Sequence, residues 1–222
     1  MRNRVLVELG VLSAATALFL LSFPDRPNRV EVSLALLALV MLAANAGYTR
    51  RVVWSAHPPA RGGPDRAGSW RAVSAFTLVA LLALAALGAS DAWRAGGGDA
   101  LRARLLDARP LAVAALYLPW ALLQQTLFQF YLLGRLLALT PGRNPAPAIV
   151  VTGLCYALVH LPDVGLAAVT AASGVFWTFC YYRYRVLLSI AASHALLGSA
   201  FYAWLYQRDM LSGALRLLRS WL

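Results

Sequence analysis

One apolar stretch, residues 110–139, restricts the possible folds of this chain more than any other segment. It is longer than the roughly 20 residues of helix that cross a lipid bilayer. Its middle carries Gln124, Gln125 and Gln129 and no charged residue. On a helix, Gln125 and Gln129 lie one turn apart on one face, with Gln124 about 100° away. Because amides are costly in hydrocarbon, these side chains must face a packed interior or a water-filled cavity.

Polar groups on two later apolar stretches leave two interpretations of the glutamines open. The amides either link helices through hydrogen bonds, or they line a buried site with His160 and His194. Tyr156 and His160 are four residues apart and share a helix face, and His194 and Gly198 have the same relation. A lone histidine in a membrane helix can be a structural donor, whereas two histidines after a glutamine cluster favour a site. We therefore predict that three helices meet and that Gln124, His160 and His194 line one hollow within the bilayer.

The composition is that of a multi-span membrane protein. Hydrophobic residues make up 60% of the 222 residues and charged ones 13%, and the mean hydropathy is +0.64, too apolar for a soluble domain of this size. All basic residues are arginine, and the formal net charge is +11. Most arginines lie in short loops between apolar stretches, so the positive-inside rule and lipid headgroups explain them better than a nucleic-acid partner does. Cys155 and Cys180 lie in apolar stretches and are predicted to be buried packing residues.

We expect an all-α fold, a polytopic bundle of about seven transmembrane helices with short interfacial helices. The predicted spans are residues 5–23, 30–48, 72–89, 110–139, 148–161, 164–182 and 186–206.

The connections between these spans carry turn and interface signals. Residues 49–71 form a polar loop with five arginines and one aspartate, the best candidate for a cytoplasmic loop. Residues 90–109 contain three consecutive glycines and then a short amphipathic segment, and residues 207–222 are a second candidate for an interfacial helix. Arg135 is counted with the loop that follows residue 139. Small residues in the stretch 164–182 would let a neighbouring helix approach closely.

Three short motifs resemble those of a known family, the CPBP intramembrane endopeptidases, which include the type II CAAX prenyl proteases and the bacteriocin-immunity proteins. That family carries Glu-Glu-x-x-x-Arg, Phe-x-x-x-His and His-x-x-x-Asn in this order on separate membrane helices. The corresponding segments here read QQTLFQ (124–129), YALVH (156–160) and HALLG (194–198). The resemblance covers residues 110–206 and implies a protease-like core there. The apolar and amphipathic patterns outside it predict an N-terminal membrane region at 1–109 and an interfacial helix at 207–222.

The resemblance implies catalytic positions for three residues, but the residue at one of these positions cannot perform the family's chemistry. In the family, the first glutamate activates a water with help from the first histidine, and the second histidine and the asparagine stabilise the oxyanion. Carried over, the catalytic positions are Gln124, His160 and His194. A glutamine cannot accept a proton from water near neutral pH, and loss of a general base typically lowers a rate by about 10² to 10⁴. Asp163 or Glu31 could supply a base to His160 instead.

Four further positions of the motifs line the predicted site. Gln125 replaces the second glutamate, Gln129 the arginine, Tyr156 the phenylalanine and Gly198 the asparagine. Compared with the two glutamates and the arginine of the family motif, the three glutamines carry no charge, but they keep hydrogen-bonding groups of similar shape. This pattern suits a neutral binding pocket and suggests a pseudoenzyme.

Two functions from different classes follow. The chain is either a CAAX-type intramembrane protease that acts on a membrane peptide or a prenylated protein, or a non-catalytic scaffold, immunity or peptide-binding protein that uses the same cavity. We expect no cofactor and no metal; axial haem ligation by the two histidines or a zinc site is a third, weaker interpretation. The expected partners are the lipid bilayer and a membrane-bound peptide, without nucleic acid, and the expected location is the bacterial inner membrane.

Overall fold

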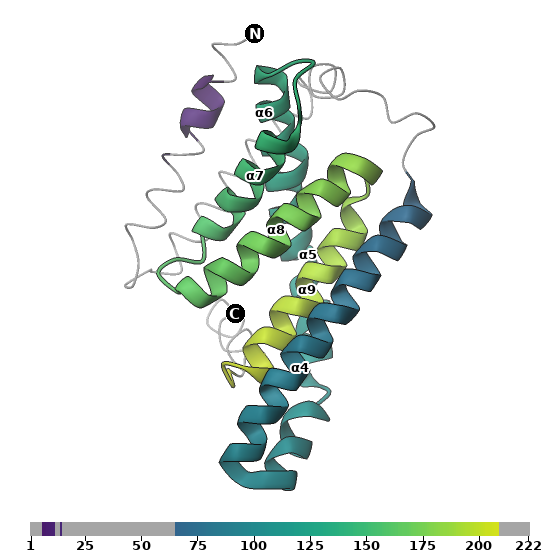
Figure 1. Ribbon diagram of the computed structural model, residues 1–222, viewed down its shortest axis with the longest axis vertical. Coiled ribbons are helices and arrows are strands. Elements are labelled where there is room, and N and C mark those ends of the chain that lie inside the picture. The colour runs from purple at the N-terminus through teal and green to yellow at the C-terminus, as the bar shows by residue number, and fades with distance from the viewer. Residues whose placement is uncertain (1–5, 12–13, 15–64, 209–222) are drawn as a thin grey trace, which may run out of the picture. The chain divides into compact units, whose positions relative to one another are not determined.

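The computed structural model describes residues 6–11, 14 and 65–208, and these residues form helices and connecting turns without any strand (Figure 1). This confirms the predicted all-α membrane fold. The helices that follow residue 65 are α4 (Arg66–Leu105), α5 (Arg109–Gln125), the π-helix η1 (Thr126–Leu132), α6 (Leu133–Leu139), α7 (Ala146–Leu158), α8 (Val164–Tyr184) and α9 (Leu187–Trp204).

Four segments among the described residues are long and apolar enough to cross a membrane. They are Arg66–Leu105, Arg109–Leu139, Val164–Tyr184 and Leu187–Trp204. The second is continuous through α5, η1 and α6, as the long apolar stretch predicts. The chain is therefore an integral membrane protein.

The other three predicted spans do not correspond to any of these four segments. The fifth, at residues 148–161, corresponds to α7, whose 13 residues extend about 20 Å and fall short of a hydrocarbon core of about 30 Å. The first two, at 5–23 and 30–48, lie outside the described residues except for residues 6–11 and 14. The expected total of about seven spans therefore remains a prediction, as does the interfacial helix at 207–222, of which only the first two residues are described.

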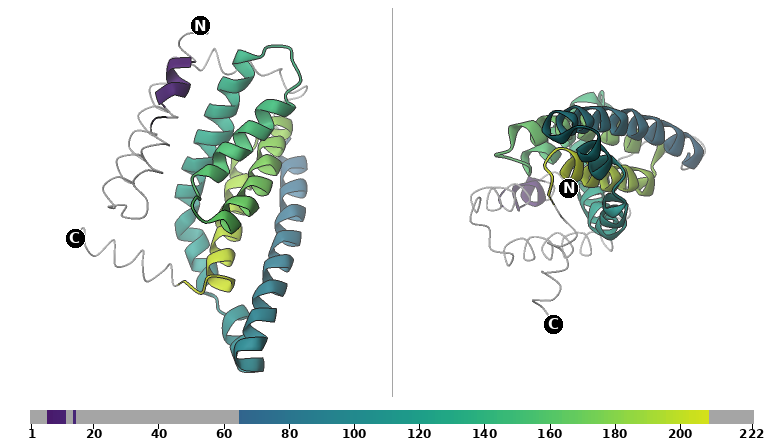
Figure 2. Two further views of the ribbon diagram at one scale, coloured as in Figure 1. Left: turned by 60° about the vertical axis from the view of Figure 1, so that its left-hand side comes forward. Right: turned by 90° about the horizontal axis from the view of Figure 1, so that it is seen from below.

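Helix α4 differs from its predicted span at both ends. It begins at Arg66, inside the predicted polar loop, and it continues to Leu105 with a break at Gly96 and Gly97. Gly97 has φ 64° and ψ −145°, a conformation open to glycine because it has no Cβ. Figures 1 and 2 show that the chain reverses at this break. Arg104 then donates to the carbonyl oxygen of Gly88 at 3.3 Å, so the short helix predicted after the glycines exists and folds back along α4.

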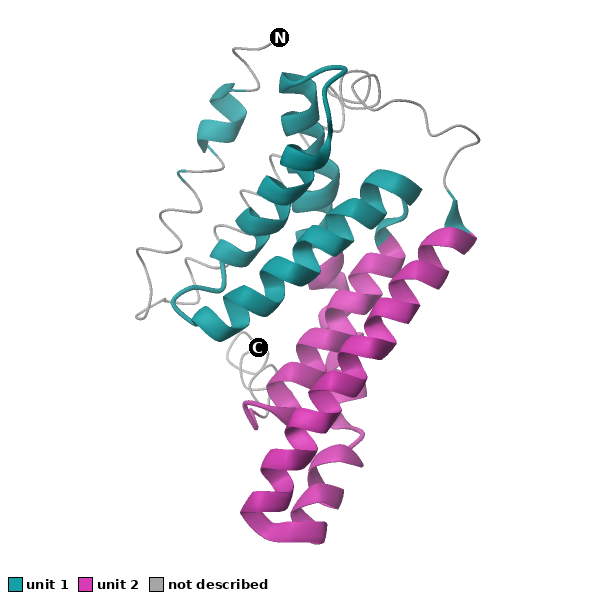
Figure 3. Ribbon diagram, in the orientation of Figure 1, with its two compact units in different colours: residues 1–66, 123–187 teal, residues 67–122, 188–222 magenta. Residues whose placement is uncertain are grey.

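The chain forms two compact units, shown in Figure 3. Unit 1 comprises residues 1–66 and 123–187, and unit 2 comprises residues 67–122 and 188–222. The chain passes from unit 2 to unit 1 near the end of α5. The division of the sequence at residues 109 and 206 describes motif boundaries and remains a prediction.

In unit 2, α4 and α5 each pack against α9. Small residues of α5 and α9, among them Ala121 and Ala191, form a fully buried contact. Between α4 and α9, the hydroxyl groups of Thr77 and Ser193 are 2.7 Å apart. Membrane helices without a hydrophobic driving force between them associate through such small residues and hydroxyl pairs.

In unit 1, α7 and α8 pack with their backbones in close contact. A Cβ atom at Gly153 would lie 2.5 Å from the backbone nitrogen of Val175, and one at Gly174 would lie 2.9 Å from the carbonyl oxygen of Gly153. The predicted close approach on this helix is thus confirmed at Gly174 and the buried Ser173. The neighbouring Ala172 is exposed and takes no part in it.

A buried ion pair connects the N-terminal segment to α6. Arg135 is 2% exposed, and its Nε lies 2.6 Å from Oε2 of Glu8. The hydroxyl of Tyr131 donates to the same carboxylate oxygen at 3.1 Å. Counting Arg135 as a loop arginine was therefore wrong, because its guanidinium is held inside the unit by a carboxylate from the distant N-terminal segment. Of the two cysteines, Cys180 is buried as predicted and Cys155 is partly exposed.

Adding one methyl group at the α7–α8 contact should destabilise unit 1. We expect Gly153→Ala to lower the thermal unfolding midpoint in detergent by several degrees, because backbone atoms of α8 must move to admit the new Cβ. Gly165→Ala on α8 is the matched control, since its Cβ would lie 3.6 Å from the nearest neighbouring atom, Oδ1 of Asp163. Equal midpoints for the two variants would contradict the close contact.

Removing one partner of the buried ion pair should be more harmful than removing both. Glu8→Gln leaves the Arg135 guanidinium buried without its carboxylate, so we expect a loss of about 3 kcal/mol of stability. The double variant Glu8→Gln/Arg135→Met should recover part of that loss, because no buried charge remains. Denaturant titration of the purified chain measures both. A double variant less stable than Glu8→Gln would show that the pair is a net source of stability.

Candidate functional site

The glutamine motif lies where the helix changes from α to π geometry. Gln124 and Gln125 end α5, and Gln129 lies in η1. The backbone N–H of Leu133 donates to the carbonyl oxygen of Phe128, five residues earlier, as a π-helix requires. Short π segments within α-helices occur frequently at functional sites. Nothing in the sequence pattern marks this change of helix type, and it was not predicted.

The glutamines are buried to different degrees. Gln125 and Gln129 are both 0% exposed, and Gln124 is partly exposed. The expectation that the amides face the protein interior therefore holds for Gln125 and Gln129. Within the described part of the chain, neither Oε1 nor Nε2 of Gln129 has a hydrogen-bond partner. Buried amides are rarely left in this state, because an unmade hydrogen bond in a buried position is costly.

An aromatic cluster joins the first two motifs within unit 1. The ring of Phe128, next to Gln129 on η1, meets the ring of Tyr156 edge to face, with centroids 5.0 Å apart. Tyr156 is 0% exposed and also packs edge to face against Trp177 of α8, at 5.8 Å. The Tyr156 and His160 rings are 5.7 Å apart, as expected for residues on one helix face.

His160 lies in the turn after α7. The helix ends at Leu158, three residues before the predicted end, and His160 follows in the turn that leads to Pro162. Nδ1 of His160 is 3.2 Å from the carbonyl oxygen of Tyr156, one of the last carbonyls of α7. Because these carbonyls have no partner within the helix, a histidine placed here can satisfy one of them. The side chain is partly exposed, so its ring remains accessible.

The third motif lies in unit 2, beside a tyrosine that the sequence analysis missed. His194 is 6% exposed, and its Nε2 is 3.4 Å from the hydroxyl of Tyr117 on α5. The two rings meet edge to face at 5.3 Å. A Cβ atom at Gly198 would lie 3.8 Å from Cε1 of Tyr117, an ordinary contact. One phenol is therefore adjacent to both positions of the third motif. The only signal in the sequence is a tyrosine inside an apolar stretch.

The structure describes the predicted convergence of three helices only in part. The structure brings the glutamine motif and the Tyr156–His160 motif together within unit 1. His194 and Gly198 belong to unit 2, and their place in a common site remains a prediction.

Of the two acidic residues proposed as alternative bases, the structure describes only Asp163. Oδ1 of Asp163 accepts a hydrogen bond from the backbone N–H of Leu166 at 2.9 Å, so this carboxylate caps the N-terminus of α8. Its service as a base for His160 remains a hypothesis. Glu31 lies outside the described residues. Among residues 6–11, 14 and 65–208, no group of three or more His, Cys, Asp or Glu side chains could hold a metal ion.

The region that contains the motifs also matches a known protein family. Residues 107–200 match the model of the type II CAAX prenyl endopeptidase Rce1-like family. This match supports membership of the chain in the CPBP family. The matched region contains all three motif segments, and the protein is thus a CAAX-protease-like membrane protein. No curated protein and no solved structure matches the chain.

Replacing the unsatisfied amide with an apolar side chain should make the unliganded protein more stable. Gln129→Leu removes two buried polar atoms that have no hydrogen-bond partner among the described residues, so we expect a gain of about 1 kcal/mol or more. Thr178→Val is the control, because its Oγ1 donates to the carbonyl oxygen of Gly174 at 2.6 Å and its removal gives no such gain. A loss of stability in Gln129→Leu, measured by denaturant titration, would mean that the amide is satisfied in the folded protein.

Proposed function

We propose that this CAAX-protease-like protein binds a membrane peptide or a prenylated protein without cleaving it, in the bacterial inner membrane. The observation that carries the proposal is the state of the glutamine motif. Gln125 and Gln129 are fully buried at the places of the family's second glutamate and arginine, and Gln129 has no partner among the described residues. A buried, neutral and unsatisfied amide is suited to receive a ligand group.

The chemistry of the amide favours binding over hydrolysis. A carboxamide offers one acceptor oxygen and two donor hydrogens and takes no proton from water. It therefore complements a peptide group, which presents one carbonyl and one N–H, and it cannot serve as the general base that the family places at the position of Gln124. The pseudoenzyme interpretation follows from this substitution.

The alternative, an active intramembrane endopeptidase, is favoured by the surroundings of His194. The hydroxyl of Tyr117 lies next to its imidazole and near Gly198, where the family has an asparagine. A phenol and an imidazole can both donate hydrogen bonds to a developing oxyanion, and such a donor contributes about 10² to 10³ in rate. In this case His160 would position the attacking water.

Restoring the family motif separates the two functions. We expect the purified wild-type chain, in nanodiscs, to bind a prenylated fluorescent peptide without cutting it. The variant Gln124→Glu/Gln125→Glu/Gln129→Arg/Gly198→Asn should cleave it, at a rate at least about 10² above wild type, because it regains a general base. Fluorescence anisotropy measures binding, and mass spectrometry of the peptide measures cleavage.

The restored variant with His160→Ala added is the control, and it should lose the gained cleavage. Cleavage by the wild-type chain that His160→Ala abolishes would overturn the non-catalytic proposal and establish the peptidase. Binding that is unchanged in Gln129→Leu would remove the buried amide from the ligand site.

A further inference from the structure

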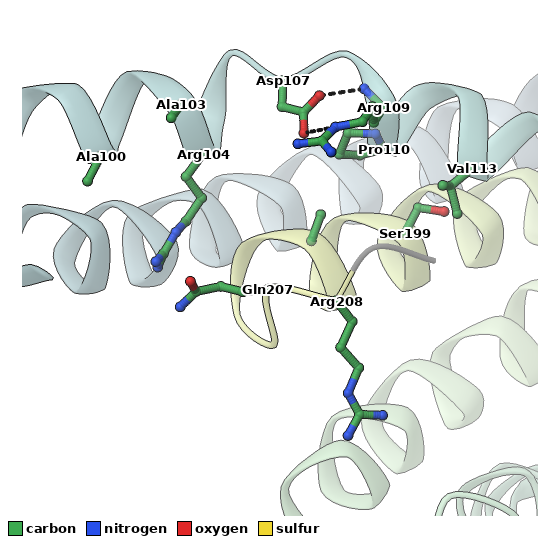
Figure 4. A pocket seen from close by; sticks show the side chains of 11 residues that line it. Ala100, Ala103, Arg104, Asp107, Arg109, Pro110, Val113, Ser199, Gln207 and Arg208 are labelled. Atoms are coloured by element: carbon green, nitrogen blue, oxygen red, sulfur yellow. Dashed lines mark hydrogen bonds and ion pairs between the residues drawn. The ribbon is translucent and has the colours of Figure 1, made fainter. Parts of the chain in front are cut away.

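Unit 2 contains a hollow of about 410 Å³ that belongs to none of the motif positions (Figure 4). It lies where three segments of the unit meet: the short helix after the glycine break in α4, the beginning of α5, and the end of α9. These segments adjoin the ends of helices that are long and apolar enough to cross a membrane. The hollow therefore lies near a boundary between hydrocarbon and headgroups.

Arginine is the dominant charged residue of this hollow. Arg104, Arg109 and Arg208 line it, and Asp107 is the one acidic residue among its lining side chains. Nε of Arg109 lies 2.8 Å from a carboxylate oxygen of Asp107, and a dashed line marks this ion pair in Figure 4. Arg104 pairs with Asp91, which lies outside the lining. Arg208 has no acidic partner among the described residues. The arginines thus outnumber the carboxylates, and the hollow has an excess of positive charge.

A buried hydroxyl adds a second, independent sign of a ligand. Ser199 of α9 lines the hollow and is 5% exposed, and its Oγ has no hydrogen-bond partner within the described part of the chain. Buried hydroxyl groups are normally satisfied. This one lacks a partner among the described residues and belongs to the lining of the hollow. The N-terminus of α5, at Arg109 and Pro110, also faces the hollow and contributes the positive end of a helix dipole.

Apart from the amide of Gln207, the remaining lining is small and apolar. Ala100, Ala103, Val113 and Ala203 supply it. A free anion would need only the donors, whereas a lipid headgroup needs donors next to an apolar surface for the beginning of its acyl chains. Guanidinium groups bind phosphate oxygens through paired hydrogen bonds, and basic pockets at the membrane interface bind anionic headgroups in this way.

We propose that this hollow binds the phosphate group of an anionic phospholipid, with Arg109 and Arg208 holding the phosphate oxygens and Ser199 donating a hydrogen bond. The excess of arginine disfavours a zwitterionic headgroup, because its ammonium group would add positive charge at the same place. The site is independent of the glutamine motif and of the proposed function.

Lipid binding to the purified full-length chain tests this proposal. Native mass spectrometry in detergent would compare phosphatidylglycerol with phosphatidylcholine. We expect wild type to prefer phosphatidylglycerol by at least about tenfold, and Arg109→Gln/Arg208→Gln to lose that preference. The matched control is Arg94→Gln/Arg102→Gln, which removes the same charge from two exposed arginines of α4 outside the lining. It should keep the preference within about twofold.

Ser199→Ala provides a variant that leaves every charge in place, and it should weaken phosphatidylglycerol binding by about fivefold. Equal losses in the two double variants would show diffuse attraction to the positive surface and overturn the proposal. Unchanged affinity in Ser199→Ala would overturn it too. Inorganic phosphate at millimolar concentration should leave lipid binding unaffected; full competition by phosphate, without any preference between the two lipids, would identify a free-phosphate site instead.

Discussion

The cost of burying polar groups in a membrane protein shapes unit 1. Hydrocarbon offers no hydrogen bonds, so each amide, guanidinium or carboxylate inside a helix bundle needs a partner or a purpose. Arg135 meets this demand through its ion pair with Glu8, whose carboxylate also accepts a hydrogen bond from the hydroxyl of Tyr131. Gln129, six residues earlier on the same continuous helix, does not meet it among the described residues. The contrast supports our proposal that Gln129 receives a ligand group.

The amide of Gln129 lies in the π-helix η1, and the preceding residue, Phe128, belongs to the aromatic cluster. A π turn widens the helix and leaves its carbonyls less regularly paired, and here it coincides with the motif that defines the family's active position. Phe128, the residue before Gln129, packs edge to face against Tyr156, which packs in the same way against Trp177. The rigid contact between Gly153 and Gly174 holds α7 and α8 together beneath these rings. Close backbone packing of this kind fixes side-chain positions, which a binding site requires.

The sequence predicted a contact between motif residues only where both lie in one segment of the chain. The motif order placed Gln124, His160 and His194 on three helices, and the four-residue spacing of Tyr156 and His160 correctly indicated neighbouring rings. The same reasoning missed Tyr117, because a single tyrosine in an apolar stretch carries no pattern. It also assigned Arg135 to a loop, because its partner Glu8 is far away in the sequence and no local rule connects them.

What the sequence determined by itself is local in origin. Apolar stretches of membrane-spanning length imply helices, since a backbone in hydrocarbon must satisfy its own hydrogen bonds, and the motif order implies the family. The tertiary structure alone decided which polar residues have partners. Tyr131 meets Glu8 across 123 residues of chain and Tyr117 meets His194 across 77, and the arginine-lined hollow joins the break in α4 to the end of α9. Such pairings depend on how helices pack, and hydropathy and spacing along one helix contain no information about that.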